Sequence, residues 1–508
     1  MCERLMSLKT SKGPLSCGPL ASSSVRVALA SSLAVLAAAS LIAAASTDGR
    51  AHPAGAADAR PNIVFILTDD LSWNLVRYMP NVRRMQREGM TFTNYFVTDS
   101  LCCPSRASIF TGRYPHNHGV LTNTAPGGGF EAFHRGAESR TFATSLQAAG
   151  YRTGMLGKYL NGYRPLSGFV PPGWNSWQVP GSAYRGFGYV MNANGRTAHY
   201  GKRRRAYITD VLRRRGKLFV SRVARAHAPF FLEVATYAPH HPFTPAPRDR
   251  FDFPGLPAPR TASFDRPVRN APAWLRDRAP LTPEETGVLD QDFRKRAQSV
   301  QAVDDLIGQI RAELAASGLD RNTYVVFSSD NGFHMGEHGL TAGKMTAFDT
   351  DIRVPLVVVG PHVPPASVTA DLTENIDLAP TFMRLGGARP PASVDGQGLV
   401  GLLHGAVPET WRDAVLVEHH HPETAEGDPD HQAAPSGNPP SYSALRTQTE
   451  TYVEYADGER EYYDLLADPD QQVNAYDELP DDRRAELHDE LMRLETCRGA
   501  GCRAITAR

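Results

Sequence analysis

The chain has 508 residues, of which 41% are hydrophobic and 21% are charged, and its formal net charge is zero. This length allows a large buried core and more than one domain. The balanced charge does not support a nucleic-acid partner, because binding to a phosphate backbone depends on an excess of positive charge. Two basic runs, residues 202–205 and 213–215, are local exceptions. They are typical of a solvated helix face or loop, and a docking patch for an anionic polymer is the alternative.

The N-terminal region has the pattern of an export signal. Basic residues precede an alanine-rich apolar run over residues 27–45, and residues 43–45 are small enough for cleavage. This pattern predicts a signal peptide over residues 1–45, an exported protein (secreted, periplasmic or at the cell surface) and no stable membrane partner. An uncleaved anchor is the alternative, because the run approaches the ~20 residues of a spanning helix. Small residues and serines dilute its hydrophobicity, which favours cleavage.

Two apolar runs each end in acidic or amide residues. Residues 62–67 predict a buried strand that is followed by Asp69 and Asp70, and residues 323–328 predict a second one that is followed by Asp330 and Asn331. Further elements are expected between and around them: strands over 229–236 and 354–360, and helices over 141–149 and 294–317. This alternation predicts an α/β sandwich on a mostly parallel sheet, whose ligands collect at the carboxyl ends of the strands.

The four polar residues after these strands form an all-oxygen donor set. Such a set suits a hard cation, Ca²⁺ or Mg²⁺, and disfavours zinc. Helix caps or solvated turns are the alternative for acidic residues at strand ends.

The rest of the chain predicts a surface excursion and a second, smaller domain. Residues 242–283 are rich in Pro, Asp and Arg and have weak periodicity. After residue 400, short strand-like runs at 414–417, 452–455 and 461–465 precede an amphipathic helix over 481–494. We therefore expect a catalytic domain over 59–400 and a mainly antiparallel domain with a helix over 401–508. Residues 419–440 are of low complexity and predict a mobile loop, with a histidine metal site as the less favoured alternative.

The six cysteines divide by position. Cys2 and Cys17 would leave with the signal peptide. Cys497 and Cys502 could form a short-loop disulfide in an oxidising compartment. Cys102 and Cys103 remain, and they begin the run Cys-Cys-Pro-Ser-Arg at residues 102–106, which continues to Thr-Gly-Arg at 111–113.

Residues 102–106 have the properties of an anion site at a helix start. Pro104 suits the first helical position, and an anion beside Cys102 would face free backbone N–H groups. Arg106 lies one turn along and offers a bidentate fork. A buried or disulfide-bonded cysteine pair is the alternative. The run resembles the signature of the formylglycine-dependent sulfatases, with Thr-Gly-Arg at the expected offset.

This resemblance implies an alkaline-phosphatase-like fold and a modified cysteine. Cys102 would be oxidised to formylglycine by a formylglycine-generating enzyme, and Cys103 would stay a thiol. The resemblance also implies one Ca²⁺, with Mg²⁺ less favoured. Its ligands would be Asp69, Asp70, Asp330, Asn331 and the modified Cys102.

Three further segments resemble parts of the same family. Residues 157–159 and 339–344 resemble segments whose lysines contact the sulfate, which points to Lys158 and Lys344. Residues 238–242 resemble the family's Pro-His-x-Pro segment, which points to His240 as the proton acceptor, with His241 less favoured by register. With Cys102 and Arg106, these residues form the expected catalytic set.

One departure from the common pattern indicates a branch of the family. Many members have a histidine two residues after the first lysine, whereas Lys158 is followed by Tyr, Leu and Asn. Residues 157–161, with the doubled cysteine and residues 114–118, resemble the N-acetylglucosamine-6-sulfatase and heparan endosulfatase branch. The leaving-group acid stays open between Lys344, His240 and a residue not identified. His116 and His118 could reach the pocket, but a structural role is more common for such residues.

The expected activity is hydrolysis of a sulfate monoester on a sugar, with an N-acetylglucosamine 6-sulfate unit as leading candidate. The partners would then be a sulfated small molecule or glycan and the maturation enzyme. An aryl sulfatase and a phosphonate or phosphate monoester hydrolase are the alternatives. A catalytically silent glycan-binding protein is disfavoured, because all of the charged motif positions are retained.

Overall fold

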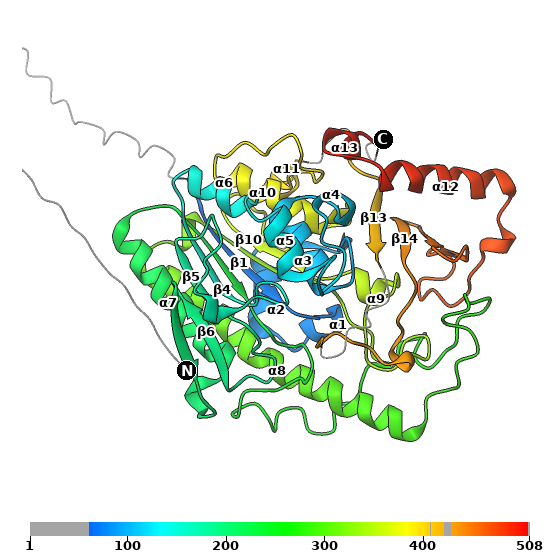
Figure 1. The fold of residues 1–508 in the computed structure, drawn as a ribbon, viewed down its shortest axis with the longest axis horizontal. Coiled ribbons are helices and arrows are strands. Elements are labelled where there is room, and N and C mark those ends of the chain that lie inside the picture. The colour runs from blue at the N-terminus through cyan, green and yellow to red at the C-terminus, as the bar shows by residue number, and fades with distance from the viewer. Residues whose placement is uncertain (1–59, 407, 421–427, 506–508) are drawn as a thin grey trace, which may run out of the picture. The chain divides into compact units, whose positions relative to one another are not determined.

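A ten-stranded sheet forms the centre of the protein in the computed structural model, which describes residues 60–406, 408–420 and 428–505 (Figure 1). Its strand order is β11-β2-β10-β9-β1-β8-β4-β5-β6-β7. The five strands from β9 to β5 run parallel, whereas β10, β6 and β7 pair antiparallel with their neighbours. In sheet order the strands are Ser367–Thr369, Met90–Phe92, Leu356–Val359, Thr323–Ser329, Asn62–Thr68, Phe230–Ala235, Arg152–Gly157, Ser176–Pro180, Tyr189–Ala193 and Arg196–Tyr200.

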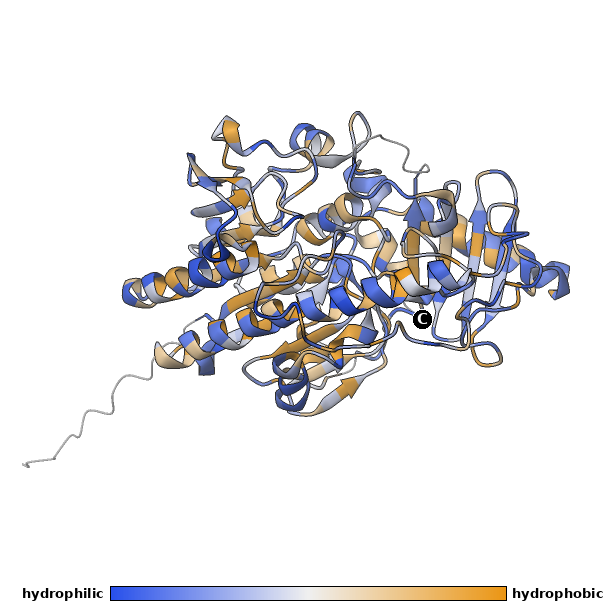
Figure 2. Cartoon of the chain, turned by 90° about the horizontal axis from the view of Figure 1, so that it is seen from below, coloured by the Kyte–Doolittle hydropathy of each residue, from blue (hydrophilic) through white to orange (hydrophobic). Residues whose placement is uncertain are grey.

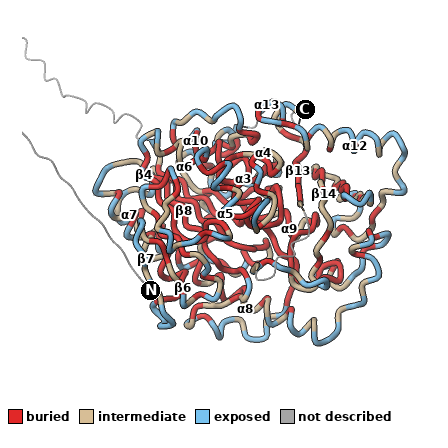
Figure 3. Tube along the Cα trace, viewed as in Figure 1, coloured by how far each residue is buried: buried red, intermediate tan, exposed pale blue. Residues whose placement is uncertain are grey.

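Helices cover both faces of this sheet because its central strands are apolar on both sides. Ile63, Phe65 and Leu67 of β1 enter one core, whereas Val64 and Ile66 enter the other. The first core is covered by α3 (Cys102–Thr111), α5 (Gly129–Gly136), α6 (Phe142–Ala148) and α10 (Leu378–Leu385). The second is covered by α1 (Trp73–Val76), α2 (Pro80–Glu88), α7 (Ile208–Ala226) and α8 (Pro283–Ala316). Figure 3 shows the sheet buried between these layers. The predicted α/β sandwich is confirmed.

Helix α8 begins earlier than the sequence analysis predicts. It starts at Pro283 rather than near residue 294, because Thr282 and Glu285 form a reciprocal capping box at its N-terminus. The first turns of α8 are polar and exposed, so apolar periodicity does not reveal them. Between Ala235 and Pro283 the chain forms no helix or strand, as expected for a surface excursion.

The C-terminal region forms a separate antiparallel sheet. Its strands are β13 (Ala414–His419), β14 (Tyr442–Thr447), β15 (Glu450–Tyr455) and β16 (Arg460–Asp464). Leu487, Leu491 and Leu494 of α12 (Asp481–Glu495) pack on one face of this sheet. Figure 2 shows the alternation of polar and apolar residues along the long helices, which matches this one-sided packing. A disulfide joins Cys497, which follows α12, to Cys502, which lies within α13 (Ala500–Ile505).

The remaining predictions concern the signal peptide, the domain boundary, membrane spans and the basic segments. The predicted signal peptide lies outside the described residues, and the domain boundary near residue 400 stays a prediction. Within the described part of the chain, no helix is both long and apolar enough to cross a membrane. The basic residues 202–205 are exposed around η2 (Arg204–Ala206), as expected for a solvated segment.

Candidate active site

The site forms where four neighbouring parallel strands end. In the order β4-β8-β1-β9, these strands are followed by Lys158, by His240, by the pair Asp69 and Asp70, and by the pair Asp330 and Asn331. Thr68 is in register with Ser329, so the two acidic pairs leave the sheet side by side. The carboxyl edge of the sheet therefore brings together residues from four distant segments of the sequence.

Helix α3 brings Cys102 and Arg106 over this edge. Leu101 is extended and precedes the helix, and Gly112 ends it with φ 68° while its N–H bonds to the Ser108 carbonyl. We predicted Pro104 at the first position of the helix. The helix begins at Cys102 instead, so Pro104 is its third residue. This is tolerated because backbone N–H groups in the first turn have no intrahelical partner to lose.

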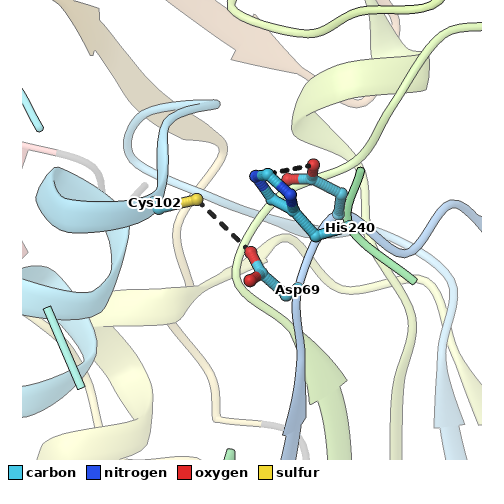
Figure 4. A group of neighbouring side chains, drawn as sticks. Asp69, Cys102 and His240 are labelled. Carbon is cyan, nitrogen blue, oxygen red and sulfur yellow. Dashed lines mark hydrogen bonds and ion pairs between the residues drawn. The ribbon is translucent and has the colours of Figure 1, made fainter. Parts of the chain in front are cut away.

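The thiol of Cys102 contacts three residues of the predicted set, and Figure 4 shows its sulfur directed at Asp69, with His240 nearby. Its Sγ is 3.0 Å from Nζ of Lys158 and 3.1 Å from Nζ of Lys344. It is 3.3 Å from Oδ1 of Asp69. Cys102 is 0% exposed, and burial raises the pKa of its thiol well above the usual value. The unmodified side chain is thus a neutral thiol, and a poor nucleophile.

Each buried cation of the site lies beside at least one carboxylate. Arg106 Nε is 2.8 Å from Asp330 Oδ2, and Lys344 Nζ is 2.7 Å from Asp70 Oδ1. Lys158 Nζ is 2.7 Å from Asp69 Oδ2. Burial opposes ionisation of Asp69, but Lys158 and the other cations outweigh it and lower its pKa to about 2.

Asp330 behaves differently from Asp69. Its burial outweighs the attraction of Arg106 and raises its pKa to about 6. These pairings leave a dense cluster of alternating charges that can reorganise around an anion or a cation.

The donor atoms of the site fit a hard cation. Oxygen or sulfur atoms of Asp69, Asp70 and Cys102 and a ring nitrogen of His240 all lie within 4.8 Å of one another. The amide oxygen of Asn331 is buried and accepts no hydrogen bond from the described residues, while its Nδ2 donates to Asp70 Oδ1 at 2.7 Å. Asp70 itself has φ 63°, a strained conformation of the kind found at ligand sites. A buried oxygen acceptor beside several carboxylates is what a cation such as Ca²⁺ requires.

His240 is held as an imidazolium. Its Nδ1 donates to the His241 carbonyl at 2.7 Å, and its Nε2 donates to Asp430 Oδ1 at 2.7 Å. Burial lowers the pKa of His240, but Asp70, Asp69 and Asp430 reverse this and raise it to about 8. His241 is exposed and points to the pocket beside the cluster, whereas His240 is buried within it, which agrees with the preference for His240 by register.

Asp430 belongs to the cluster although the sequence analysis did not identify it. Its Oδ1 is 2.5 Å from Lys344 Nζ, and its Oδ2 accepts from Asn123 Nδ2 at 2.5 Å. It lies in the segment over residues 419–440 that we predicted to be a mobile loop, of which residues 419–420 and 428–440 are described. Low complexity and the absence of periodicity gave no signal for this residue. The only available indication was its charge.

The histidines after α3 lie elsewhere. His118 Nε2 is 3.0 Å from Ser108 Oγ, and His116 Nδ1 is 2.8 Å from Glu418 Oε2. His116 Nε2 is also 3.0 Å from the Cys497 carbonyl oxygen. Both histidines join α4 (Pro115–His118) to neighbouring elements, which is the structural role expected.

A pocket of about 500 Å³ opens beside the cluster. Asp70, His240 and Lys344 lie at its inner end, and Phe243, Val288 and Phe333 supply apolar walls. A cavity of this size with charged groups at one end suits a small polar ligand that carries an anionic group.

The fold and this site define a hydrolase of the sulfatase family, and comparison with known proteins agrees. The sequence model of the sulfatase family matches residues 61–388, and a model described as "N-sulphoglucosamine sulphohydrolase, C-terminal" matches residues 336–497. The chain belongs to the sulfatase family and is a sulfuric ester hydrolase.

Two relatives place it within the family, and one solved structure shares its fold. The chain is 35% identical to an N-acetylglucosamine-6-sulfatase from Homo sapiens, over 87% of this chain and 86% of that protein. It is 36% identical to the extracellular sulfatase SULF-1 homolog of Drosophila melanogaster, over 72% of this chain and 33% of that protein. A structure solved with its substrate D-glucosamine-2-N,6-O-disulfate has a TM-score of 0.69 and 24% identity, and covers 86% of this chain and 97% of that one. The predicted branch is thereby confirmed.

Proposed function

We propose that the matured protein removes the 6-sulfate of an N-acetylglucosamine unit, with Cys102 converted to formylglycine. The observation that carries this proposal is the position of Cys102, whose Sγ contacts Lys158, Lys344 and Asp69 at 3.0–3.3 Å. The similarity to N-acetylglucosamine-6-sulfatases supports the choice of sugar.

The residues around position 102 have separate tasks in this proposal. Arg106, Lys158 and Lys344 bind the sulfate oxygens and stabilise the negative charge that grows on them in the transition state. The hydrate of a formylglycine aldehyde would supply two hydroxyls. One would attack sulfur while the bond from sulfur to the alcohol oxygen breaks and the alcohol leaves, and deprotonation of the other would expel sulfate and restore the aldehyde. His240, whose ring atom lies within 4.8 Å of Cys102 Sγ, would accept that proton after its ring has first lost one of the two protons with which it bonds to the His241 carbonyl and to Asp430.

The proposed cation is one Ca²⁺. Asp69, Asp70, Asp330, Asn331 and the modified residue 102 would hold it, because these positions offer oxygen donors only. When bound, the cation would acidify the diol and neutralise charge on the ester. Elemental analysis of the purified protein should find about one calcium per chain. Stoichiometric zinc without calcium would contradict the assignment.

The alcohol part of the substrate would occupy the 500 Å³ pocket. Its charged inner end and apolar walls fit a sugar that presents a sulfate on a primary alcohol. The decisive measurement is kcat/KM on 6-sulfated N-acetylglucosamine, on other sulfated sugars, on nitrophenyl sulfate and on a phosphonate monoester. Preference for the aryl ester by orders of magnitude, without release from any sugar, would refute the glycan substrate. Preference for the phosphonate would refute the sulfate ester itself.

Maturation and export complete the proposal. A formylglycine-generating enzyme would act on residues 102–106, and the signal peptide over residues 1–45 would direct the protein out of the cytoplasm. Mass spectrometry of the tryptic peptide that contains Cys102 should show the aldehyde. N-terminal sequencing of the exported protein should begin near Ser46. An unmodified Cys102 in fully active protein would contradict the mechanism.

A further inference from the structure

The Asp430 carboxylate contacts Lys344, which would bind a sulfate oxygen, and His240, which would lie beside the bound sulfate. Its Oδ1 is 2.5 Å from Lys344 Nζ and 2.7 Å from His240 Nε2. Its Oδ2 accepts from Asn123 Nδ2 at 2.5 Å. Asp430 is 3% exposed, so this negative charge lies inside the site.

The segment that carries Asp430 is anchored to the loop that carries Lys344. The Thr341 N–H donates to the Pro435 carbonyl at 3.0 Å, and the Lys344 N–H donates to Gln432 Oε1 at 3.3 Å. These bonds fix the backbone on the C-terminal side of Asp430. The position of the carboxylate beside Lys344 is thus part of the fold and does not depend on a single ion pair.

A count of hydrogen-bond donors shows that Asp430 excludes a ligand. The Lys344 ammonium has three N–H bonds, and three acceptors surround it: Asp70 Oδ1 at 2.7 Å, Cys102 Sγ at 3.1 Å and Asp430 Oδ1 at 2.5 Å. His240 Nε2 has one N–H bond, and it is directed at Asp430. A sulfate oxygen can therefore bind either group only after one acceptor leaves.

Asp430 is the acceptor that can leave without dismantling the site. Cys102 is the reacting residue, and Asp70 belongs to the oxygen donor set at the end of β1. A carboxylate and a sulfate monoester each carry one negative charge. Their exchange therefore keeps the buried cations neutralised.

We propose that the Asp430 carboxylate is an internal competitor for the sulfate group: it holds Lys344 and His240 until a sulfate oxygen takes its place. Asp430 then sets the affinity of the site for anions, and it keeps Lys344 and His240 paired between turnovers. This inference rests on the proposed function, because that function assigns Lys344 to the sulfate oxygens and places His240 beside the reacting group.

The test is a charge-removing substitution with a matched control. Asp430→Asn keeps the shape of the side chain and removes the competing charge. Asp428→Asn makes the same chemical change two residues away, where the side chain caps the Asp430 N–H at 2.7 Å. Asn can still accept that bond. KM for nitrophenyl sulfate and the inhibition constant of inorganic sulfate should both fall on the order of tenfold in Asp430→Asn. KM should change more than kcat in the Asp430→Asn variant, and the Asp428→Asn variant should stay close to the wild type.

Two outcomes would overturn the inference. Unchanged KM and unchanged sulfate inhibition in Asp430→Asn would show that no competition exists. A large fall in kcat at constant KM would make Asp430 a participant in the reaction instead of a competitor.

Direct binding separates this inference from the proposed function. If the wild type hydrolyses no sulfate ester, calorimetric titration with sodium sulfate still compares the two proteins. Tighter sulfate binding by Asp430→Asn would support the competition, and equal binding would reject it.

A second measurement needs no variant, in case Asp430→Asn does not fold. Saturating sulfate should increase hydrogen exchange of the backbone amides around Asp430 in the wild-type enzyme, because its side chain is released. Unchanged or slower exchange there would contradict the inference.

Discussion

The ten-stranded sheet and the C-terminal region contribute to the active site in different ways. The large sheet delivers acidic, basic and amide side chains directly after the ends of four adjacent strands. The C-terminal region delivers Asp430 from the long connection between β13 and β14. Strand ends are held by ladders of backbone hydrogen bonds, whereas a connection can change without loss of the sheet. The comparison teaches that the residues proposed to hold the cation follow rigid strand ends, whereas the proposed competitor for sulfate lies in a connection.

The largest expected effect concerns the two adjacent cysteines at the start of α3. Cys102→Ala should lower kcat for nitrophenyl sulfate by at least about 10⁴-fold, because no nucleophile remains. Cys103→Ala should be far milder, since the Cys103 Sγ only accepts the Asn161 N–H at 3.2 Å. Equal loss in both variants would mean that α3 tolerates no change. Such a result would contradict the proposal that Cys102 reacts and that Cys103 does not.

The next effect compares carboxylates at strand ends of the two sheets. Asp330→Ala removes the partner of Arg106 at 2.8 Å and leaves a buried guanidinium without that charge. We expect loss of bound calcium, a fall in activity of about 10²-fold or more, and destabilisation of roughly 3–5 kcal/mol.

The matched control for Asp330 is Asp464→Ala, at the exposed end of β16. Asp464 Oδ1 accepts only the N–H groups of a turn, including that of Leu466 at 2.9 Å. Its loss should cost about 1 kcal/mol or less. Calcium content and urea unfolding measure both variants. A similar cost for both would contradict the difference between the two sheets.

A buried glutamate in each sheet sharpens the comparison through pH. Burial raises the pKa of Glu233 to about 8, and neither of its carboxylate oxygens has a hydrogen-bond partner among the described residues. Because the folded pKa lies above the usual 4.5, the folded state binds the proton more tightly. The stability that this group provides is present below about pH 4.5 and is lost as the pH rises to about 8.

Glu233→Gln should remove this dependence on pH. The free energy of unfolding should exceed that of the wild type by roughly 3 kcal/mol at pH 9, with little difference at pH 5. In the C-terminal sheet, Glu461 accepts hydrogen bonds from the Tyr455 and Tyr463 hydroxyls, each at 3.0 Å. Glu461→Gln should stabilise less, because it disturbs bonds that exist. Urea titrations at the two pH values test this, and a pH-independent difference for Glu233→Gln would count against it.

The smallest effect concerns the start of α8. Thr282→Ala removes the side-chain acceptor of the Glu285 N–H, a bond of 3.2 Å. We expect a loss of about 1 kcal/mol in the urea unfolding free energy and no change in kcat. An unchanged unfolding midpoint would mean that the cap adds nothing to this long helix.

The sequence predicted those parts of the molecule whose place in the fold follows from a local pattern of residues. Apolar runs located β1, β8 and β9, and the residues after them were the site residues that the structure brings together. Asp430 could not be found in this way, because its place depends on the packing of a connection against the Lys344 loop. The beginning of α8 carried a capping box that apolar periodicity ignores. The edge strand β7 and its neighbour β6 have mixed polarity, so apolar runs did not reveal them.

The complete burial of Cys102 determines the order in which oxidation and folding can occur. Lys158, Lys344 and Asp69 enclose its sulfur, and the side chain is 0% exposed. An enzyme that must grip the peptide around residue 102 cannot reach the thiol after the sheet has closed. The proposed oxidation therefore belongs to the interval between synthesis and folding. A chain that folds before oxidation would stay inactive. The yield of active protein therefore depends on the rate of Cys102 oxidation relative to the rate of folding.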